Sequence, residues 1–97
     1  MAALSTHVLD TATGRPAAGI AVALERDGIV LARATTDADG RVRALASSLA
    51  AGRYRLVFEL AEGFFRRVAL DIEIGSEAKY HVPLLITPFG VTSYRGS

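Results

Sequence analysis

The chain contains no cysteine among its 97 residues. A disulfide, a thiolate nucleophile and a cysteine-based zinc site are therefore excluded, so packing and assembly must supply the stability. No apolar run reaches the roughly 18 residues of a membrane span, and the sequence does not open with the basic start and apolar stretch of a signal peptide. We expect an unexported protein that has no membrane partner and works in the reducing cytoplasm.

Long runs of one charge sign are missing as well. Eleven basic and ten acidic side chains leave a formal net charge of +1, which argues against a nucleic-acid partner. Hydrophobic residues, by contrast, make up 51% of the sequence. A chain this short buries only about 60 to 65% of the surface that its unfolded form exposes. Association should cover part of the remaining apolar surface, and we expect a homo-oligomer.

No repeat or linker divides the chain, so residues 1–97 are expected to form a single domain. Period-two alternation outnumbers helical periodicity and predicts an all-β sandwich of eight short antiparallel strands. Asp27 and Gly28 offer the positive φ angles of a two-residue hairpin turn, and residues 37–40 form a second turn. The last six expected strands cover residues 29–36, 41–45, 53–60, 68–74, 80–87 and 91–95.

Two segments are expected to be irregular. The Ala- and Ser-rich residues 44–51 predict a loop. Pro83 cannot donate a hydrogen bond to a sheet, so its strand is expected at an edge or at a bulge.

Two histidines and one arginine are the candidates for chemistry. His7 shares a strand face with Ser5, and His81 shares one with Pro83, so each imidazole projects from a regular strand. With a reference pKa near 6.5, an imidazole can take a proton from water or return one at neutral pH. Arg41 follows the second turn, where its guanidinium could stabilise negative charge on carbonyl oxygens. Taken singly, structural imidazoles and a solvated arginine are the simpler interpretations.

The chain ends in Tyr94-Arg95-Gly96-Ser97. Most C-termini fray. Here the four residues directly follow an expected strand, Gly96 permits backbone conformations closed to other residues, and Tyr94 could anchor the segment in an interface.

Other constellations are weaker. Ser5 and Asp10 lie on opposite faces of one strand, which excludes a triad with His7 inside that strand. A zinc site would need copies of His7 and His81 gathered by symmetry, and no glycine loop is arranged to cradle a phosphate. We therefore expect neither a metal nor a cofactor.

Three segments stand out together. They are residues 4–20 with His7 and Thr13-Gly14-Arg15-Pro16, residues 39–45 with Arg41, and residues 80–97 with His81 and the terminal motif. They resemble the 5-hydroxyisourate hydrolases, the transthyretin-related enzymes of urate breakdown, over nearly the whole chain. The resemblance implies a transthyretin-like β-sandwich of two four-stranded sheets, assembled as a homotetramer with active sites in the channel where dimers meet.

By position, the resemblance implies four catalytic residues and three that line the substrate site. The catalytic residues are His7, Arg41, His81 and Ser97, and the lining residues are Tyr94, Arg95 and Gly96. The implied reaction opens the six-membered ring of 5-hydroxyisourate by attack of water on a ring carbonyl, giving 2-oxo-4-hydroxy-4-carboxy-5-ureidoimidazoline. One histidine would activate the water, Arg41 would stabilise the oxyanion, and the other histidine would orient substrate or protonate the leaving nitrogen. The sequence does not say which histidine takes which role.

The chain also departs from the family pattern. Val91-Thr92-Ser93 stands where an aromatic residue and Ser-Thr are usual, Lys79 stands where histidine is common, and the stretch from 65 to 80 is short and expected to lack a helix. Two alternatives stay open. One is a non-catalytic binding module like transthyretin, whose channel carries hydrophobic hormones. The other is a sandwich that only mediates assembly, in which the three candidate side chains would be freely replaceable.

Overall fold

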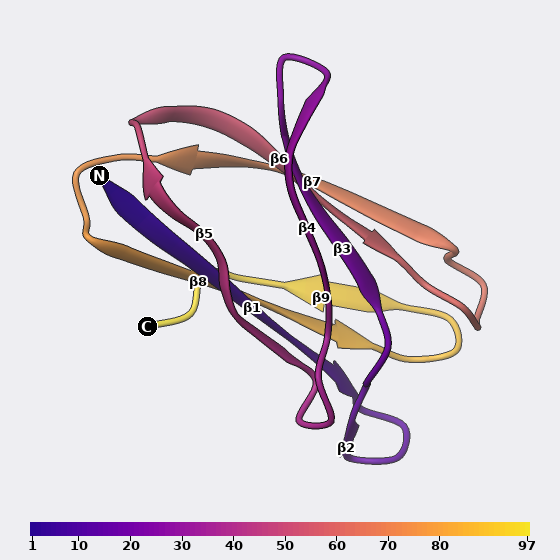
Figure 1. The fold of residues 1–97 in the computed structure, drawn as a ribbon. Helices are drawn as coiled ribbons and strands as arrows, with labels where there is room; N and C mark the ends of the chain where they lie inside the picture. Colours follow the sequence, from indigo (N-terminus) through magenta and orange to yellow (C-terminus); the bar gives the residue numbers. More distant parts are fainter.

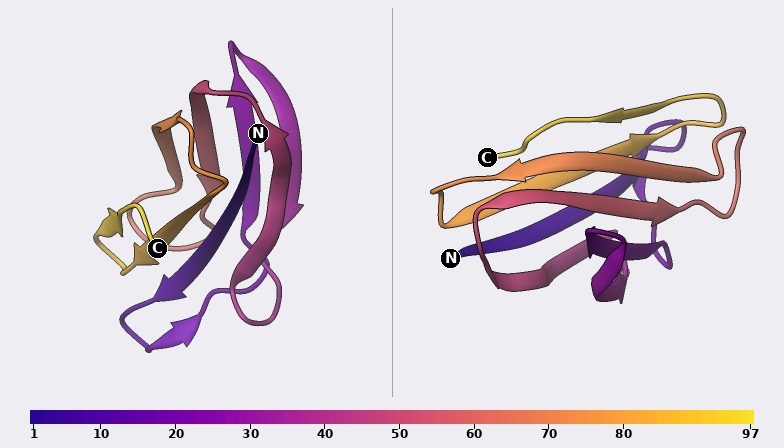
Figure 2. Two further views of the ribbon diagram at one scale, coloured as in Figure 1. Left: turned by 90° about the vertical axis from the view of Figure 1, so that its left-hand side faces the viewer. Right: turned by 90° about the horizontal axis from the view of Figure 1, so that it is seen from above.

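The computed structural model describes all 97 residues and consists of strands and their connections, without a helix (Figure 1). The strands are β1 (Ala2–Asp10), β2 (Arg15–Pro16), β3 (Ala21–Arg26), β4 (Ile29–Thr35), β5 (Arg41–Leu49), β6 (Gly52–Glu59), β7 (Arg67–Ile74), β8 (Lys79–Ile86) and β9 (Val91–Ser93). They form two packed layers (Figure 2), which confirms the expected all-β sandwich. No element is a helix long and apolar enough to cross a membrane.

The first sheet is built around β1 and β8. Its order is β2-β1-β8-β9, and β5 pairs with β1 along the same edge as the two-residue β2. The second sheet has the order β4-β3-β6-β7. Apart from the short β2, the structure therefore has the two four-stranded sheets that the sequence led us to expect.

Alternate side chains of the two sheets meet in one core. Its most deeply buried large members are Leu4, Val8, Leu24, Leu56, Phe58, Ile74 and Leu84. Leu4, Thr6 and Val8 of β1 all point into this core, with at most 1% of each residue exposed. Because successive side chains of a strand point to opposite faces, Ser5 and His7 are turned outward.

One strand pair runs in the direction opposite to the one expected. The sequence predicts antiparallel neighbours, but β1 and β8 are parallel from the pair Ala3 and Lys79 to the pair Asp10 and Ile86. Thr6 supports this pairing from the core side, because its Oγ1 donates to the Val82 carbonyl at 2.6 Å. Alternation identifies the buried face of a strand but carries no information on the direction of its neighbour.

The assignment of residues 44–51 to a loop is wrong, because β5 continues to Leu49. Two register shifts interrupt its pairing with β1, and Ser48 has a positive φ of 58°. Such bulges disturb the regular alternation by which a strand is recognised in a sequence.

Pro83 was expected at an edge or a bulge, but it lies in an interior strand whose pairing with β1 has no register shift. β8 pairs with β1 along its length, but with β9 only at residues 84–86. Pro83 lies between that ladder and the isolated antiparallel bridge of His81 with Gly96, and its carbonyl accepts a bond from Ser93 Oγ at 2.8 Å. Proline, which has no N–H to donate, thus stands where the pairing on this side of β8 is interrupted.

Both expected turns are present. Asp27 and Gly28, with φ angles of 53° and 78°, connect β3 to β4. In the second turn the Gly40 N–H donates to the Asp37 carbonyl at 2.9 Å. This turn delivers the chain into β5, directly before Arg41.

Candidate active site

The expected catalytic side chains from three strands share the outward face of the first sheet. His7 of β1 is the antiparallel neighbour of Arg41 of β5, and Ser5 of β1 is the parallel neighbour of His81 of β8. Ser5 and His7 are two residues apart and so lie on one face. Because β5, β1 and β8 are adjacent (Figure 1), groups distant in the sequence lie side by side.

His81 is partly buried, and its imidazole ring takes part in a hydrogen bond. Ser5 Oγ lies 2.8 Å from His81 Nδ1. Burial lowers the pKa of His81 below its ordinary value of 6.5, and the charges of Arg41 and His7 lower it further. Each of these effects disfavours the imidazolium. His81 is therefore mainly neutral at pH 7, the form that can accept a proton.

Arg41 is anchored through its backbone, while its guanidinium has no hydrogen-bond or ion-pair partner within the chain. The Arg41 N–H donates to Asp37 Oδ1 at 3.0 Å. This bond is the main reason why the pKa of the Asp37 carboxyl is lowered. The neighbouring Arg43 differs, since its guanidinium lies 3.6 Å from Asp39. Arg41 is thus the arginine of this turn that is available to a ligand.

The last residues of the chain fold back along β8. β9 ends at Ser93, two residues earlier than the sequence predicts. Beyond it, the Arg95 guanidinium carbon lies 4.9 Å from the centroid of the Tyr80 ring, a cation–π arrangement.

Gly96 brings this segment against the candidate histidine. Its N–H donates to the His81 carbonyl at 2.7 Å. A Cβ at this position would lie only 2.8 Å from His81 Cδ2, closer than real Cβ contacts allow. The close approach therefore requires glycine, and the terminal motif is packed on His81 rather than frayed.

An open cavity of about 550 Å³ lies at this junction. It is lined by Ser5, Thr6, Arg41, Arg43, Lys79, Tyr80, His81, Arg95, Gly96 and Ser97. Four of these residues are lysine or arginine and none has an acidic side chain. Such a wall favours an anion, or a group on which negative charge develops during a reaction.

Two of the expected residues do not line this cavity in the single chain. His7 lies beside it on the same sheet face. Tyr94, which is 55% exposed, instead lines a cavity between β7 and β9 together with Leu70 and Ile72. Arg41, His81, Arg95, Gly96 and Ser97 are the expected residues that the fold gathers in one place.

Ser5 is the contact that the sequence analysis missed. The sequence indicates that Ser5 shares a strand face with His7 and excludes it from a triad with His7 and Asp10, but it does not indicate a contact with His81. Its place two residues before His7 was a usable signal, since both share a face. Its bond to His81, however, follows from the parallel register of β1 and β8, which alternation does not reveal.

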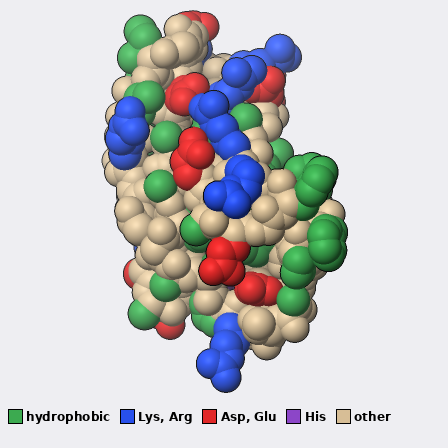
Figure 3. Space-filling view, turned by 90° about the vertical axis from the view of Figure 1, so that its right-hand side faces the viewer, with side chains coloured by type: hydrophobic (Ala, Val, Ile, Leu, Met, Phe, Trp, Pro, Cys, Tyr) green, Lys and Arg blue, Asp and Glu red, His purple; other side chains and the backbone are tan.

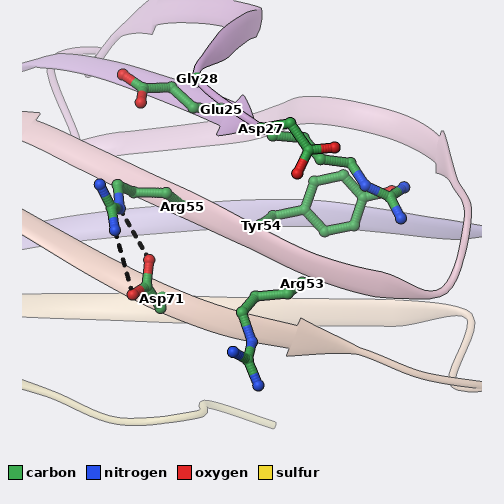
Figure 4. Close-up of a pocket in the computed structure, with 8 residues that line it drawn as sticks. Glu25, Asp27, Gly28, Arg53, Tyr54, Arg55 and Asp71 are labelled. Carbon is green, nitrogen blue, oxygen red and sulfur yellow. Dashed lines mark hydrogen bonds and ion pairs between the residues drawn. The ribbon is translucent and has the colours of Figure 1, made fainter.

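A second cavity, of about 350 Å³, lies beside the β3–β4 turn (Figure 4). It contains one internal ion pair: Arg55 Nε donates to Asp71 Oδ1 at 2.8 Å, which raises the pKa of Arg55 and lowers that of Asp71. Figure 3 shows acidic and basic groups interspersed over one face of the molecule, with no histidine in view. Neither this face nor the second cavity presents a histidine.

A sequence model described as the HIUase/Transthyretin family matches residues 4–96. The chain belongs to this family. Its curated relatives include the 5-hydroxyisourate hydrolase of Caulobacter vibrioides, which is 41% identical over 115 aligned positions that cover 100% of both chains. With 97 residues, the present chain leaves 18 of those positions without a counterpart. The resemblance stated from the three segments is thereby confirmed.

Solved structures agree with the family assignment. One described as Klebsiella pneumoniae 5-hydroxyisourate hydrolase has a TM-score of 0.94 and 43% identity, with 100% of both chains covered. Sea bream transthyretin in complex with thyroxine has a TM-score of 0.87 at 25% identity, covering 96% of this chain and 93% of that one. The expected transthyretin-like fold is confirmed.

Proposed function

We propose that the protein is an enzyme of urate degradation that hydrolyses 5-hydroxyisourate to 2-oxo-4-hydroxy-4-carboxy-5-ureidoimidazoline. Its similarity to 5-hydroxyisourate hydrolases along the full chain supports this reaction. The observation that carries the proposal is the cavity itself, in which a neutral His81 lies near the unpaired guanidinium of Arg41 and no acidic side chain lines the wall.

In the proposed mechanism, His81 is the general base. It takes a proton from water as the oxygen attacks the ring carbonyl, and the Arg41 guanidinium stabilises the oxyanion that forms. The ring C–N bond then breaks, and the leaving nitrogen takes up a proton from His7, on the same face of the sheet. The product carries a new carboxylate, which suits the cationic wall. No metal or cofactor is needed, because water and two imidazoles supply every transferred group.

The terminal motif supplies the rest of the proposed site. Arg95 and Ser97 bind polar edges of the substrate ring from the side opposite Arg41, and Gly96 allows them to approach His81. Tyr94 would reach the substrate only if a neighbouring chain completed the site.

Adding the purified protein to 5-hydroxyisourate freshly generated by urate oxidase tests the proposal. The ultraviolet decay of the substrate should run faster than its spontaneous decay, and the product should carry the new carboxylate. A decay that the protein leaves unchanged would favour the non-catalytic binding module, the alternative suggested by the fold of sea bream transthyretin.

We also propose that the chain assembles as a homotetramer in the cytoplasm, without a nucleic-acid or membrane partner. β7 and β9 end their sheets on the same side of the sandwich, and apolar Leu70, Ile72 and Ile74 line the cavity between them. Open strand edges are templates for pairing with another chain, and a two-fold axis could extend both sheets at once. Light scattering should give four times the chain mass of 10.3 kDa; a monomer would contradict the assembly.

A further inference from the structure

The Ser5 hydroxyl forms a hydrogen bond with the imidazole ring of His81. The two residues are cross-strand neighbours in the parallel pair of β1 and β8. The side chain of serine is short, and its Oγ reaches Nδ1, the ring nitrogen nearer to the backbone, at 2.8 Å. Ser5 Oγ has no other hydrogen-bond partner within the chain.

Gly96 lies against the other side of the same ring. Its backbone approaches His81 so closely that an added Cβ would lie 2.8 Å from Cδ2. Nδ1 and Cδ2 are the two ring atoms bonded to Cγ, and both are now in contact with protein. His81 lines the cavity, and Cε1 and Nε2 are the ring atoms that neither of these two contacts involves.

We propose that Ser5 is a positioning residue for His81: its Oγ accepts a hydrogen bond from Nδ1–H and thereby fixes the tautomer whose Nε2 is unprotonated. A neutral imidazole carries a single N–H, so a hydrogen on Nδ1 leaves the lone pair on Nε2. That nitrogen can then take a proton from water. If the hydroxyl donated instead, Nε2 would carry the hydrogen and could not act as the base. The catalytic part of this inference rests on the proposed hydrolase function.

A purely structural role for the hydroxyl is the competing explanation. The junction of β1 and β8 has other support, however, because Thr6 Oγ1 donates to the Val82 carbonyl at 2.6 Å inside the core. The parallel register also continues on both sides of Ser5, from Ala3 to Asp10. Loss of the Ser5 hydroxyl should consequently change the ring of His81 and the turnover rather than the fold.

Nitrogen-15 NMR of the imidazoles in the whole protein, at a pH where His81 is neutral, reads the tautomer directly. The wild-type protein should show His81 with a protonated Nδ1 and a bare Nε2. A wild-type spectrum with the hydrogen on Nε2 would overturn the proposal. This measurement does not depend on turnover. An inactive wild-type protein would contradict the proposed function, whereas the tautomer of His81 would still be tested by the spectrum.

Variants then connect the tautomer with the reaction. Ser5→Ala should lower kcat about tenfold to a hundredfold, leave KM within about twofold, and mix the two tautomers of His81. Ser5→Thr keeps a hydroxyl and should recover most of the rate and the single tautomer. Ser47→Ala removes an exposed serine from β5 of the same sheet and should match the wild-type protein.

Circular dichroism establishes that each variant is folded. A folded Ser5→Ala protein with wild-type kcat and a single unchanged tautomer would defeat the proposal. If Ser5→Ala does not fold, the wild-type and Ser5→Thr proteins still test the proposed Nδ1–H tautomer of His81. A Nε2–H tautomer in either protein would contradict it.

Discussion

Gly96→Ala tests whether His81 works in the position in which the terminal segment packs against it. The new Cβ would lie 2.8 Å from His81 Cδ2, whereas ordinary contacts begin at 3.4 Å. The ring and the segment must separate by roughly 0.6 Å, and a misplacement of about 1 Å can cost on the order of a hundredfold in rate. We expect kcat/KM to fall about tenfold to a hundredfold. The free energy of unfolding should change by less than about 0.5 kcal/mol, because this segment lies outside the core.

The assay follows the ultraviolet decay of 5-hydroxyisourate with the spontaneous rate subtracted. Gly90→Ala is the matched control, since Gly90 lies between β8 and β9 and its Cβ would meet only the Thr87 hydroxyl, at 3.3 Å. The control should keep wild-type kcat/KM. A Gly96→Ala protein within twofold of the wild-type value would refute the idea that the close contact with His81 is part of the working site.

Further predictions concern the charged groups and the core. His7→Ala, Arg41→Ala and His81→Ala should each lower turnover at least about a hundredfold with the mass by light scattering unchanged; wild-type rates in all three would remove the mechanism. Because the pKa of His81 is lowered, the acidic limb of kcat/KM against pH should lie below 6.5, and a limb above that value would contradict the assignment of the base. The same lowering means that the folded protein binds fewer protons than the unfolded chain just below pH 6.5. The free energy of unfolding, from urea titrations, should therefore decrease as pH falls from 6.5 towards the lowered pKa, and His81→Ala should lack this component. Phe58→Ala removes a fully buried ring and should cost about 3 to 5 kcal/mol in the same titrations; a loss under about 1 kcal/mol would place Phe58 outside the core.

Much of the sandwich could be predicted because burial in a strand repeats every two residues. Phe58 lies on the apolar stripe of β6 and is fully buried, as its alternation indicates. The turn at Asp27 and Gly28 is equally local, since the two residues themselves supply the positive φ angles. The parallel pairing of β1 with β8 is different, because it joins residues 76 positions apart. Nothing within either segment encodes the direction of so distant a neighbour.

In the candidate site, too, local features could be predicted from the sequence and long-range contacts could not. His7, Arg41 and His81 could be named from their chemistry and from the resemblance. The hydrogen bond of Ser5 with His81 could not, because it follows from the register of the parallel strands. The separation of Tyr94 from that cavity was equally hidden in the sequence.

His81 is held from both edges of β8, and the two sides differ in stability. On one side β1 pairs with β8 along an uninterrupted parallel register that includes Ser5. On the other side, beyond Ser93, the terminal segment is held by the bond from the Gly96 N–H to the His81 carbonyl and by the stacking of Arg95 on Tyr80. Segments with few contacts open at a lower free energy than the core does. The segment carrying Arg95 and Ser97 should therefore detach while the sandwich is still folded. In a urea titration, activity should be lost at a lower urea concentration than the folded structure.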